Sequence, residues 1–144
     1  MKYHKPIKTV NPKGVPKISV PKTPLCIVEA KNNEKGKSMK QKNVEIIKEM
    51  KARLQNKFDS ISEVMLFGSQ ATGDAGEFSD YDILIIVAHP VFWRQEREIV
   101  DEVYSIDLKY DIVTDVKIIS QRELKTLRGK QPFIRRALHE GVVA

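Results

Sequence analysis

Two short apolar runs, separated by a polar stretch, constrain the fold of this 144-residue chain more than any other feature. The runs are residues 63–67, with Val, Met, Leu and Phe, and residues 81–87, with Ile, Leu and Val. Runs of this length, bounded by glycine or polar residues, are typical of buried β-strands. The second run is apolar at nearly every position after Asp82, which indicates a central strand covered on both faces.

Helical periodicity surrounds these strands. The first predicted helix has Asn43 at its N-cap and an apolar stripe at Val44, Ile47, Met50, Leu54 and Phe58. Pro90 opens a second helix to about residue 108, with an inner stripe at Phe92, Ile99, Val103 and Ile106. Residues 69–73 read as one or two helical turns, 74–79 as a loop and 111–119 as a third strand.

The C-terminal part adds a capping box at Ser120 and Glu123, which predicts a short helix to about residue 127. Pro132 fits the first turn of a final helix that Gly141 ends. We therefore expect an α+β fold: a small mixed β-sheet of three or four strands with helices packed against it.

Charge divides the chain into two parts. Residues 1–40 hold ten lysines, two glutamates and five of the seven prolines, whereas residues 41–144 hold fifteen Lys and Arg against seventeen Asp and Glu. We expect 1–40 to be a disordered basic tail and 41–144 to be one folded domain. Alternatives for the tail are a basic arm that contacts nucleic acid or a partner, or an upstream extension of a chain that starts at Met39. The folded part has a net charge of −2, which argues against a polymerase or a tRNA-type transferase.

Cysteine and histidine usage excludes other classes. Cys26 is the single cysteine, so an internal disulfide is impossible, and the three scattered histidines give no zinc-ligand spacing. No apolar run reaches the roughly 18 residues that a membrane span needs. We expect a cytoplasmic protein without a membrane partner.

The chemistry lies between the two apolar runs. Gly68 and Ser69 follow the first strand and open a helical turn, where backbone N–H groups favour a bound phosphate. Asp80 and Asp82 are two residues apart at the start of the second strand, so both point to the same face. Two such carboxylates repel each other unless a hard cation such as Mg²⁺ or Mn²⁺ lies between them.

The third strand offers a third carboxylate. Asp111 and Asp115 would share a face of that strand, and we favour Asp115 because it lies mid-strand. Three carboxylates beside a phosphate-binding turn suit two-metal phosphoryl transfer. Asp115 would then ligate the second metal or accept the proton of the attacking hydroxyl.

The pattern Gly68-Ser69, ten residues, Asp80-Tyr81-Asp82 resembles the G-S-x10-D-x-D signature of the polymerase-beta-type nucleotidyltransferases. The Asp115 strand and the closing Pro-Phe-Ile and Glu-Gly segments are similar to the minimal nucleotidyltransferases of prokaryotes, over about residues 43–142. The resemblance implies the nucleotidyltransferase fold, ATP or another NTP as donor, Mg²⁺ and release of pyrophosphate. It assigns nucleotide binding to Gly68 and Ser69, and catalysis and metal binding to Asp80, Asp82 and Asp115.

Some members of this group are antitoxins that adenylylate a HEPN toxin. The resemblance therefore implies transfer of NMP, with AMP from ATP as the first expectation, to an acceptor such as a cognate toxin, within a homo- or hetero-oligomer. The alternative is a non-catalytic antitoxin module that binds a nucleotide or a partner. Gln70 departs from the arginine that relatives commonly carry after Gly-Ser.

Other residues admit both a functional and a packing interpretation. Lys117 would contact a phosphate or keep an edge strand soluble. Tyr81 points away from the two aspartates and predicts core packing, while Phe92 and Trp93 indicate a packing anchor or a dimer surface. Arg128, Lys130, Arg135 and Arg136 form either a solvated helix face or a patch for a triphosphate or an acidic partner.

Overall fold

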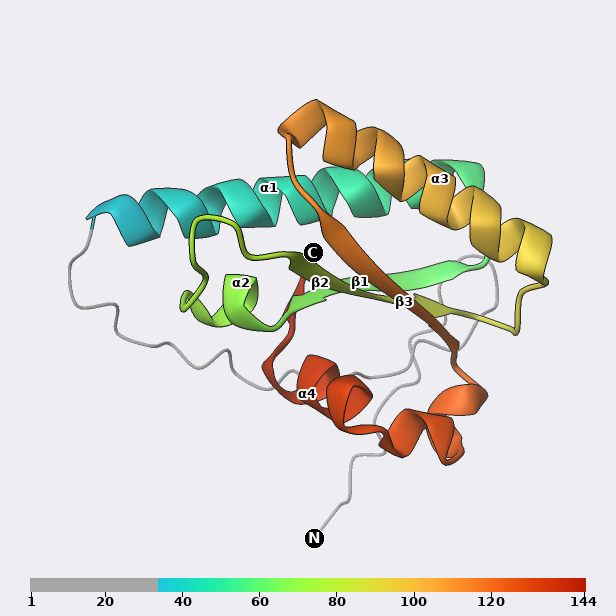
Figure 1. Ribbon diagram of the computed structural model, residues 1–144. Coiled ribbons are helices and arrows are strands. Elements are labelled where there is room, and N and C mark those ends of the chain that lie inside the picture. Colours follow the sequence, from blue (N-terminus) through green and yellow to red (C-terminus); the bar gives the residue numbers. More distant parts are fainter. Residues whose placement is uncertain (1–33) are drawn as a thin grey trace, which may run out of the picture.

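A mixed four-stranded sheet lies between two helical layers in the computed structural model, which describes residues 34–144 (Figure 1). The strands are β1 (Ile61–Phe67), β2 (Tyr81–Val87), β3 (Thr114–Ser120) and β4 (Val142–Val143). Their order across the sheet is β3-β2-β1-β4, with β2 parallel to β3 and β1 antiparallel to both β2 and β4. The expected α+β fold with a small mixed sheet is confirmed.

The helices cover both faces of this sheet. Figure 1 shows α1 (Glu34–Lys57) and α3 (Trp93–Tyr110) on one face and α4 (Pro132–Glu140) on the other. The short helix α2 (Ser69–Thr72) follows β1 directly. Two 3₁₀ turns, η1 (Glu123–Lys125) and η2 (Arg128–Lys130), lead from β3 to α4. None of the helices in this described part of the chain is long and apolar enough to cross a membrane.

Alternation along β2 divides the apolar core into two layers. Ile83 and Ile85 pack beneath α1 and α3, whereas Leu84 and Ile86 pack beneath α4. All four are at most 2% exposed, which confirms that β2 is covered on both faces. Full burial of each such side chain contributes about 1.5–3 kcal/mol to folding. The polar residues at the start of β2 therefore lie at one end of a central strand that is held in place by burial on both faces.

Several boundaries differ from the predictions. Helix α1 begins at Glu34, so Asn43 lies inside the helix instead of capping it. Residues 34–42 consist mostly of long polar side chains that favour helix, which lets α1 extend beyond its apolar stripe. Of the expected tail, residues 1–33 lie outside the described part of the chain. Strand β4 was not identified individually because two residues show no readable alternation.

Helix α3 starts later than predicted because Phe92 has an extended backbone, with φ −74° and ψ 156°. Its side chain is 84% exposed, so its assignment to the inner stripe was wrong, whereas Ile99, Val103 and Ile106 are buried as expected. The capping box is confirmed. The N–H of Ser120 donates to Oε2 of Glu123 (2.9 Å) and the N–H of Glu123 donates to Oγ of Ser120 (3.2 Å), although the helix they open is only the 3₁₀ turn η1.

Candidate functional site

The pairing of β2 with β3 brings two of the three candidate carboxylates onto neighbouring positions. Asp82 is in register with Asp115 on β3 and with Phe67, the last residue of β1. Adjacent strands lie about 4.8 Å apart, and residues in register point to the same face. Asp82 alternates with Ile83, which packs beneath α1 and α3, so the two carboxylates belong to the face that α4 partly covers.

Asp80 precedes β2 and is exposed, yet its negative charge affects the Asp82 carboxylate. The pKa of Asp82 is raised, first because the side chain is partly desolvated and then because the negative charges of Asp115 and Asp80 are close. The positive charges of Lys117 and Arg136 offset part of this increase. The three carboxylates therefore form one electrostatic cluster at the edge of the sheet.

Gly68 occupies a position where any other residue would be strained. Its backbone has φ +71° and ψ −157°, a region essentially closed to other residues. A Cβ added there would collide with Oδ2 of Asp82 and lie 3.1 Å from its Cγ. The turn after β1 thus contacts the Asp82 carboxylate directly. Ser69, the second residue of the predicted phosphate-binding turn, is the first residue of α2.

Lys117 lies on the same edge and is engaged with Asp115. Its Nζ is 2.7 Å from Oδ1 of Asp115, and both side chains are about half exposed. Such a pair adds at most about 1 kcal/mol to stability. The Asp115 carboxylate is therefore paired with the ammonium group of a lysine on the same strand, β3, which is an edge strand of the sheet.

The donor set fits a hard divalent cation, but its side chains are not drawn together. Carboxylate oxygens are the ligands that Mg²⁺ and Mn²⁺ prefer. Burial first, and then the nearby negative charges of Asp115 and Asp80, raise the pKa of Asp82, and a cation would offset the repulsion between these charges. Within the part of the chain that the structure describes, no group of three or more His, Cys, Asp or Glu side chains is arranged to hold a metal ion. A shared ion would require Asp115 to turn from Lys117 towards Asp82.

Asp111 does not belong to this cluster. It lies just after α3 with a left-handed backbone (φ +52°, ψ 54°), and its N–H donates to the carbonyl of Asp107. The expectation that Asp111 shares a strand face with Asp115 was wrong, because α3 extends to Tyr110 and β3 begins only at Thr114. Asp111, which the sequence pattern assigned to the strand, instead caps the C-terminal end of α3.

The predicted basic group near the C-terminus has divided roles. Arg128 pairs with Glu123 at 2.6 Å and donates to the carbonyl of Ile118 at 3.3 Å, so it stabilises the turn after β3. Arg136, on α4, is near enough to lower the pKa of Asp82. The carboxylate cluster is therefore flanked by one cation on β3, Lys117, and one on α4.

A buried polar network beside the site was missed by sequence reasoning. Asn43, Gln70 and Tyr81 are each less than 10% exposed and are joined by hydrogen bonds between α1, α2 and β2. Gln70 thus faces the interior, where its side-chain amide takes part in the network. A signal was available, since Asn43 lies four residues before Ile47 on the apolar stripe, where a polar residue needs a partner.

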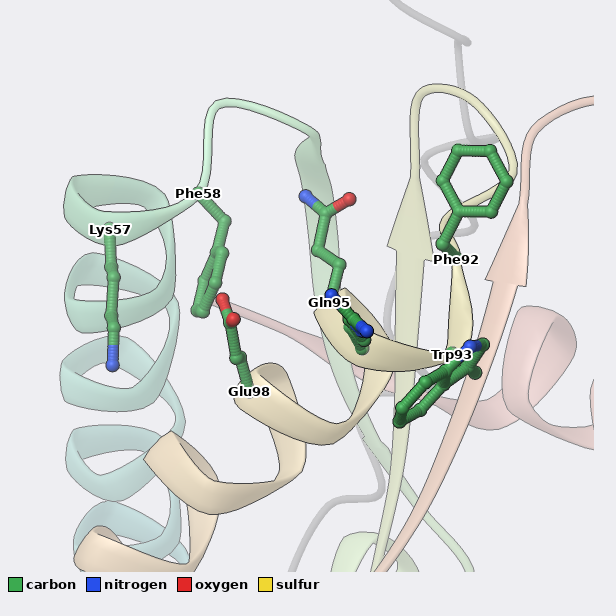
Figure 2. Close-up of a pocket in the computed structure, with 7 residues that line it drawn as sticks. Lys57, Phe58, Phe92, Trp93, Gln95 and Glu98 are labelled. Carbon is green, nitrogen blue, oxygen red and sulfur yellow. The ribbon is translucent and has the colours of Figure 1, made fainter.

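A separate surface hollow of about 770 Å³ lies between the C-terminal end of α1 and the N-terminal end of α3. Figure 2 shows Phe58, Trp93 and Gln95 around it. These residues adjoin the start of β1 and follow the end of β2, whereas Asp82 and Asp115 lie at the opposite end of the strands. Phe92 and Trp93 are 84% and 66% exposed, so they are not the expected packing anchor. The hollow is not part of the carboxylate cluster.

Comparisons with known proteins identify the family of the chain. Residues 44–142 match the model of the nucleotidyltransferase domain family. A protein of Methanocaldococcus jannaschii, named as a candidate protein adenylyltransferase, is 38% identical over 84 residues, covering 58% of this chain and 84% of the relative. 

Solved structures show a looser likeness. A candidate nucleotidyltransferase from Sulfolobus solfataricus is 19% identical, with 79% of this chain and 89% of that chain covered and a TM-score of 0.49. A toxin–antitoxin complex with AMP-PNP is 18% identical, with 72% and 70% covered and a TM-score of 0.45. The family model spans more than two thirds of the sequence, including the glycine-serine turn and all three carboxylates, and the chain therefore belongs to the nucleotidyltransferase domain family.

Proposed function

We propose that this chain transfers AMP from ATP to a protein acceptor in a reaction that depends on a divalent metal. The observation that carries the proposal is the register of Asp82 with Asp115 beside Gly68, in a chain of the nucleotidyltransferase family. The name of the 38% identical relative supports a protein as the acceptor and AMP as the transferred group. 

In this proposal a nucleophilic oxygen of the acceptor forms a bond to the α-phosphorus of ATP. The bond from that phosphorus to the bridging oxygen breaks, and pyrophosphate leaves with the electron pair. Asp80, Asp82 and Asp115 would hold Mg²⁺ or Mn²⁺, which stabilises the charge that develops on the phosphate oxygens. Asp115 would also accept the proton of the attacking group.

The cations that flank the carboxylates have a role in the same scheme. Lys117 and Arg136 already act on the field at Asp82, and a triphosphate carries the negative charge that they would bind. If Asp115 turned from Lys117 to help hold a metal ion, the Lys117 ammonium group would be available to contact a phosphate. The Gly68–Ser69 turn would let a nucleotide approach the backbone closely, because Gly68 has no side chain.

The test is label transfer from α-labelled ATP in the presence of Mg²⁺. The acceptors are the full chain itself, the protein encoded by the adjacent gene (a cognate toxin being the first candidate) and a protein extract. Transfer should occur with wild type and fall by at least a hundredfold in Asp80→Asn and Asp82→Asn. Glu77→Gln, an exposed carboxylate in the same loop, is the matched control and should keep full activity. Equal labelling by the control and the aspartate variants would refute the proposal.

A second candidate is an antitoxin module that binds a nucleotide or a partner without chemistry. The ion pair between Asp115 and Lys117 favours it, because that pair satisfies Asp115 without metal. This candidate predicts that Asp80→Asn and Asp82→Asn neutralise the partner as well as wild type does. Loss of neutralisation in variants that still fold and still bind the partner would exclude it.

A further inference from the structure

A buried chain of hydrogen bonds runs from α1 through α2 to the segment before β2. The hydroxyl of Tyr81 donates to Oδ1 of Asn43 at 2.9 Å. Nδ2 of Asn43 donates to the backbone carbonyl of Gln70 at 3.2 Å and to its Oε1 at 3.3 Å. Nε2 of Gln70 donates to the carbonyl of Ser79 at 2.9 Å. The chain therefore begins and ends on the two residues that flank Asp80.

Burial makes this arrangement specific. Asn43, Gln70 and Tyr81 are 6%, 7% and 8% exposed, so a side chain that lost its partner would keep the cost of desolvation. Burial also raises the pKa of the Tyr81 phenol, which keeps its hydroxyl protonated and able to donate. Networks of buried polar groups with all members satisfied favour one geometry over its alternatives.

Asp80 is the one carboxylate of the cluster that the sheet does not hold. It precedes β2 and is exposed, whereas Asp82 and Asp115 have register partners on adjacent strands. Its backbone position is set by its two neighbours: Ser79 accepts from Gln70, and Tyr81 donates its N–H to Val113 (2.8 Å) and its hydroxyl to Asn43. Gln70 in turn follows the Gly68–Ser69 turn directly.

We propose that Asn43, Gln70 and Tyr81 are positioning residues that fix Asp80 relative to the Gly68–Ser69 turn. They thereby set the affinity of the site for a metal–nucleotide complex, although none of them contacts the nucleotide. This inference rests on the proposed function, because it assigns a metal-binding role to Asp80. It gives the Gln70 amide a specific task, since this side chain joins Asn43 to the carbonyl of Ser79.

The experiment compares two disrupting variants with a matched control. Gln70→Met keeps the length of the side chain and removes both hydrogen bonds of the side-chain amide. Tyr81→Phe removes only the hydroxyl oxygen, while the ring keeps its packing. Gln121→Met is the control, since Nε2 of Gln121 bridges to Ser62 Oγ at 3.0 Å at the opposite end of the strands. Each full-length variant is measured for urea unfolding, for calorimetric binding of Mn²⁺ with a non-hydrolysable ATP analogue, and for label transfer as a function of Mg²⁺.

We expect both disrupting variants to raise the Kd of the Mn²⁺–nucleotide complex and to lower turnover, each by roughly ten- to a hundredfold, as outer partners of metal ligands typically do. Gln121→Met should stay within about twofold of wild type in Kd even where it unfolds more easily.

Wild-type Kd in Tyr81→Phe, or in a folded Gln70→Met, would overturn the inference. A Kd that simply tracks unfolding free energy across all the variants, Gln121→Met included, would also overturn it by reducing the network to a structural role. If wild type binds Mn²⁺ and the nucleotide but labels no acceptor, the proposed function fails while the binding data still decide this inference. If wild type binds neither, both are rejected.

Discussion

The substitution Gly68→Ala tests the geometry of the site most directly, because one added carbon atom meets both the backbone and a candidate catalytic carboxylate. At φ +71° and ψ −157° an alanine costs roughly 1–3 kcal/mol in backbone strain. The added Cβ also collides with Oδ2 of Asp82, and forcing that side chain off its rotamer costs about 0.5–1.5 kcal/mol more. We therefore expect a total loss of about 2–4 kcal/mol in the free energy of unfolding.

The assay is urea unfolding followed by circular dichroism. With an m-value of about 1–3 kcal/mol/M, the midpoint should fall by roughly 1–2 M, and the protein should remain folded without denaturant because such domains have about 5–15 kcal/mol in total. Label transfer by the folded variant should fall about a hundredfold, since displacement of a reacting group by about 1 Å has that effect.

Gly76→Ala is the control in the same loop. A Cβ there would lie 3.6 Å from Ser79 Oγ, an ordinary contact, and the residue has no positive φ. Its unfolding free energy should stay within about 0.5 kcal/mol of wild type or rise slightly, because the unfolded chain loses freedom. If Gly68→Ala proved as stable and as active as Gly76→Ala, the close approach of the turn to Asp82 would be refuted.

Three further substitutions test separate features. Asp82→Asn should stabilise the metal-free fold at pH 7 while it abolishes transfer. Because the folded-state pKa of Asp82 is raised, the stability of the wild type falls as the pH rises from about 4 through that pKa. The extra unfolding free energy of Asp82→Asn over wild type, measured by denaturation in the presence of a chelator, should therefore shrink towards pH 4. An extra unfolding free energy that stays constant with pH would contradict this. Asp111→Gly should raise the unfolding free energy by about 0.5–1 kcal/mol by relieving its left-handed backbone, with unchanged transfer; a lower thermal midpoint would count against that reading. Ser120→Ala should cost about 1 kcal/mol by removing one half of the capping box with Glu123, and an unchanged urea midpoint would show that the box contributes nothing.

Much of the architecture was predictable because its signals are local. The apolar run at 81–87 is short, rich in isoleucine and bounded by polar residues, which favours a buried strand. The spacing of Ile99, Val103 and Ile106 matches one face of a helix. Two aspartates separated by one residue share a strand face whatever surrounds them. The family itself could be identified from the spacing of the glycine-serine turn and the two aspartates.

Tertiary structure decided what depends on contacts between distant segments. The register of β2 with β3 sets Asp82 beside Asp115, and the turn after β1 brings Gly68 against Asp82. Both contacts are between segments far apart in the sequence, so no local pattern encodes them. Asn43 is of a residue type that favours helix caps, and its hydrogen bonds to α2 and β2 show that it is instead a buried member of the polar network. Local preference is a property of neighbours in sequence, whereas the energy of a buried polar group depends on whichever atoms the fold places against it. For that reason the types of the site residues were readable in the sequence, whereas the partners that complete the buried network were not.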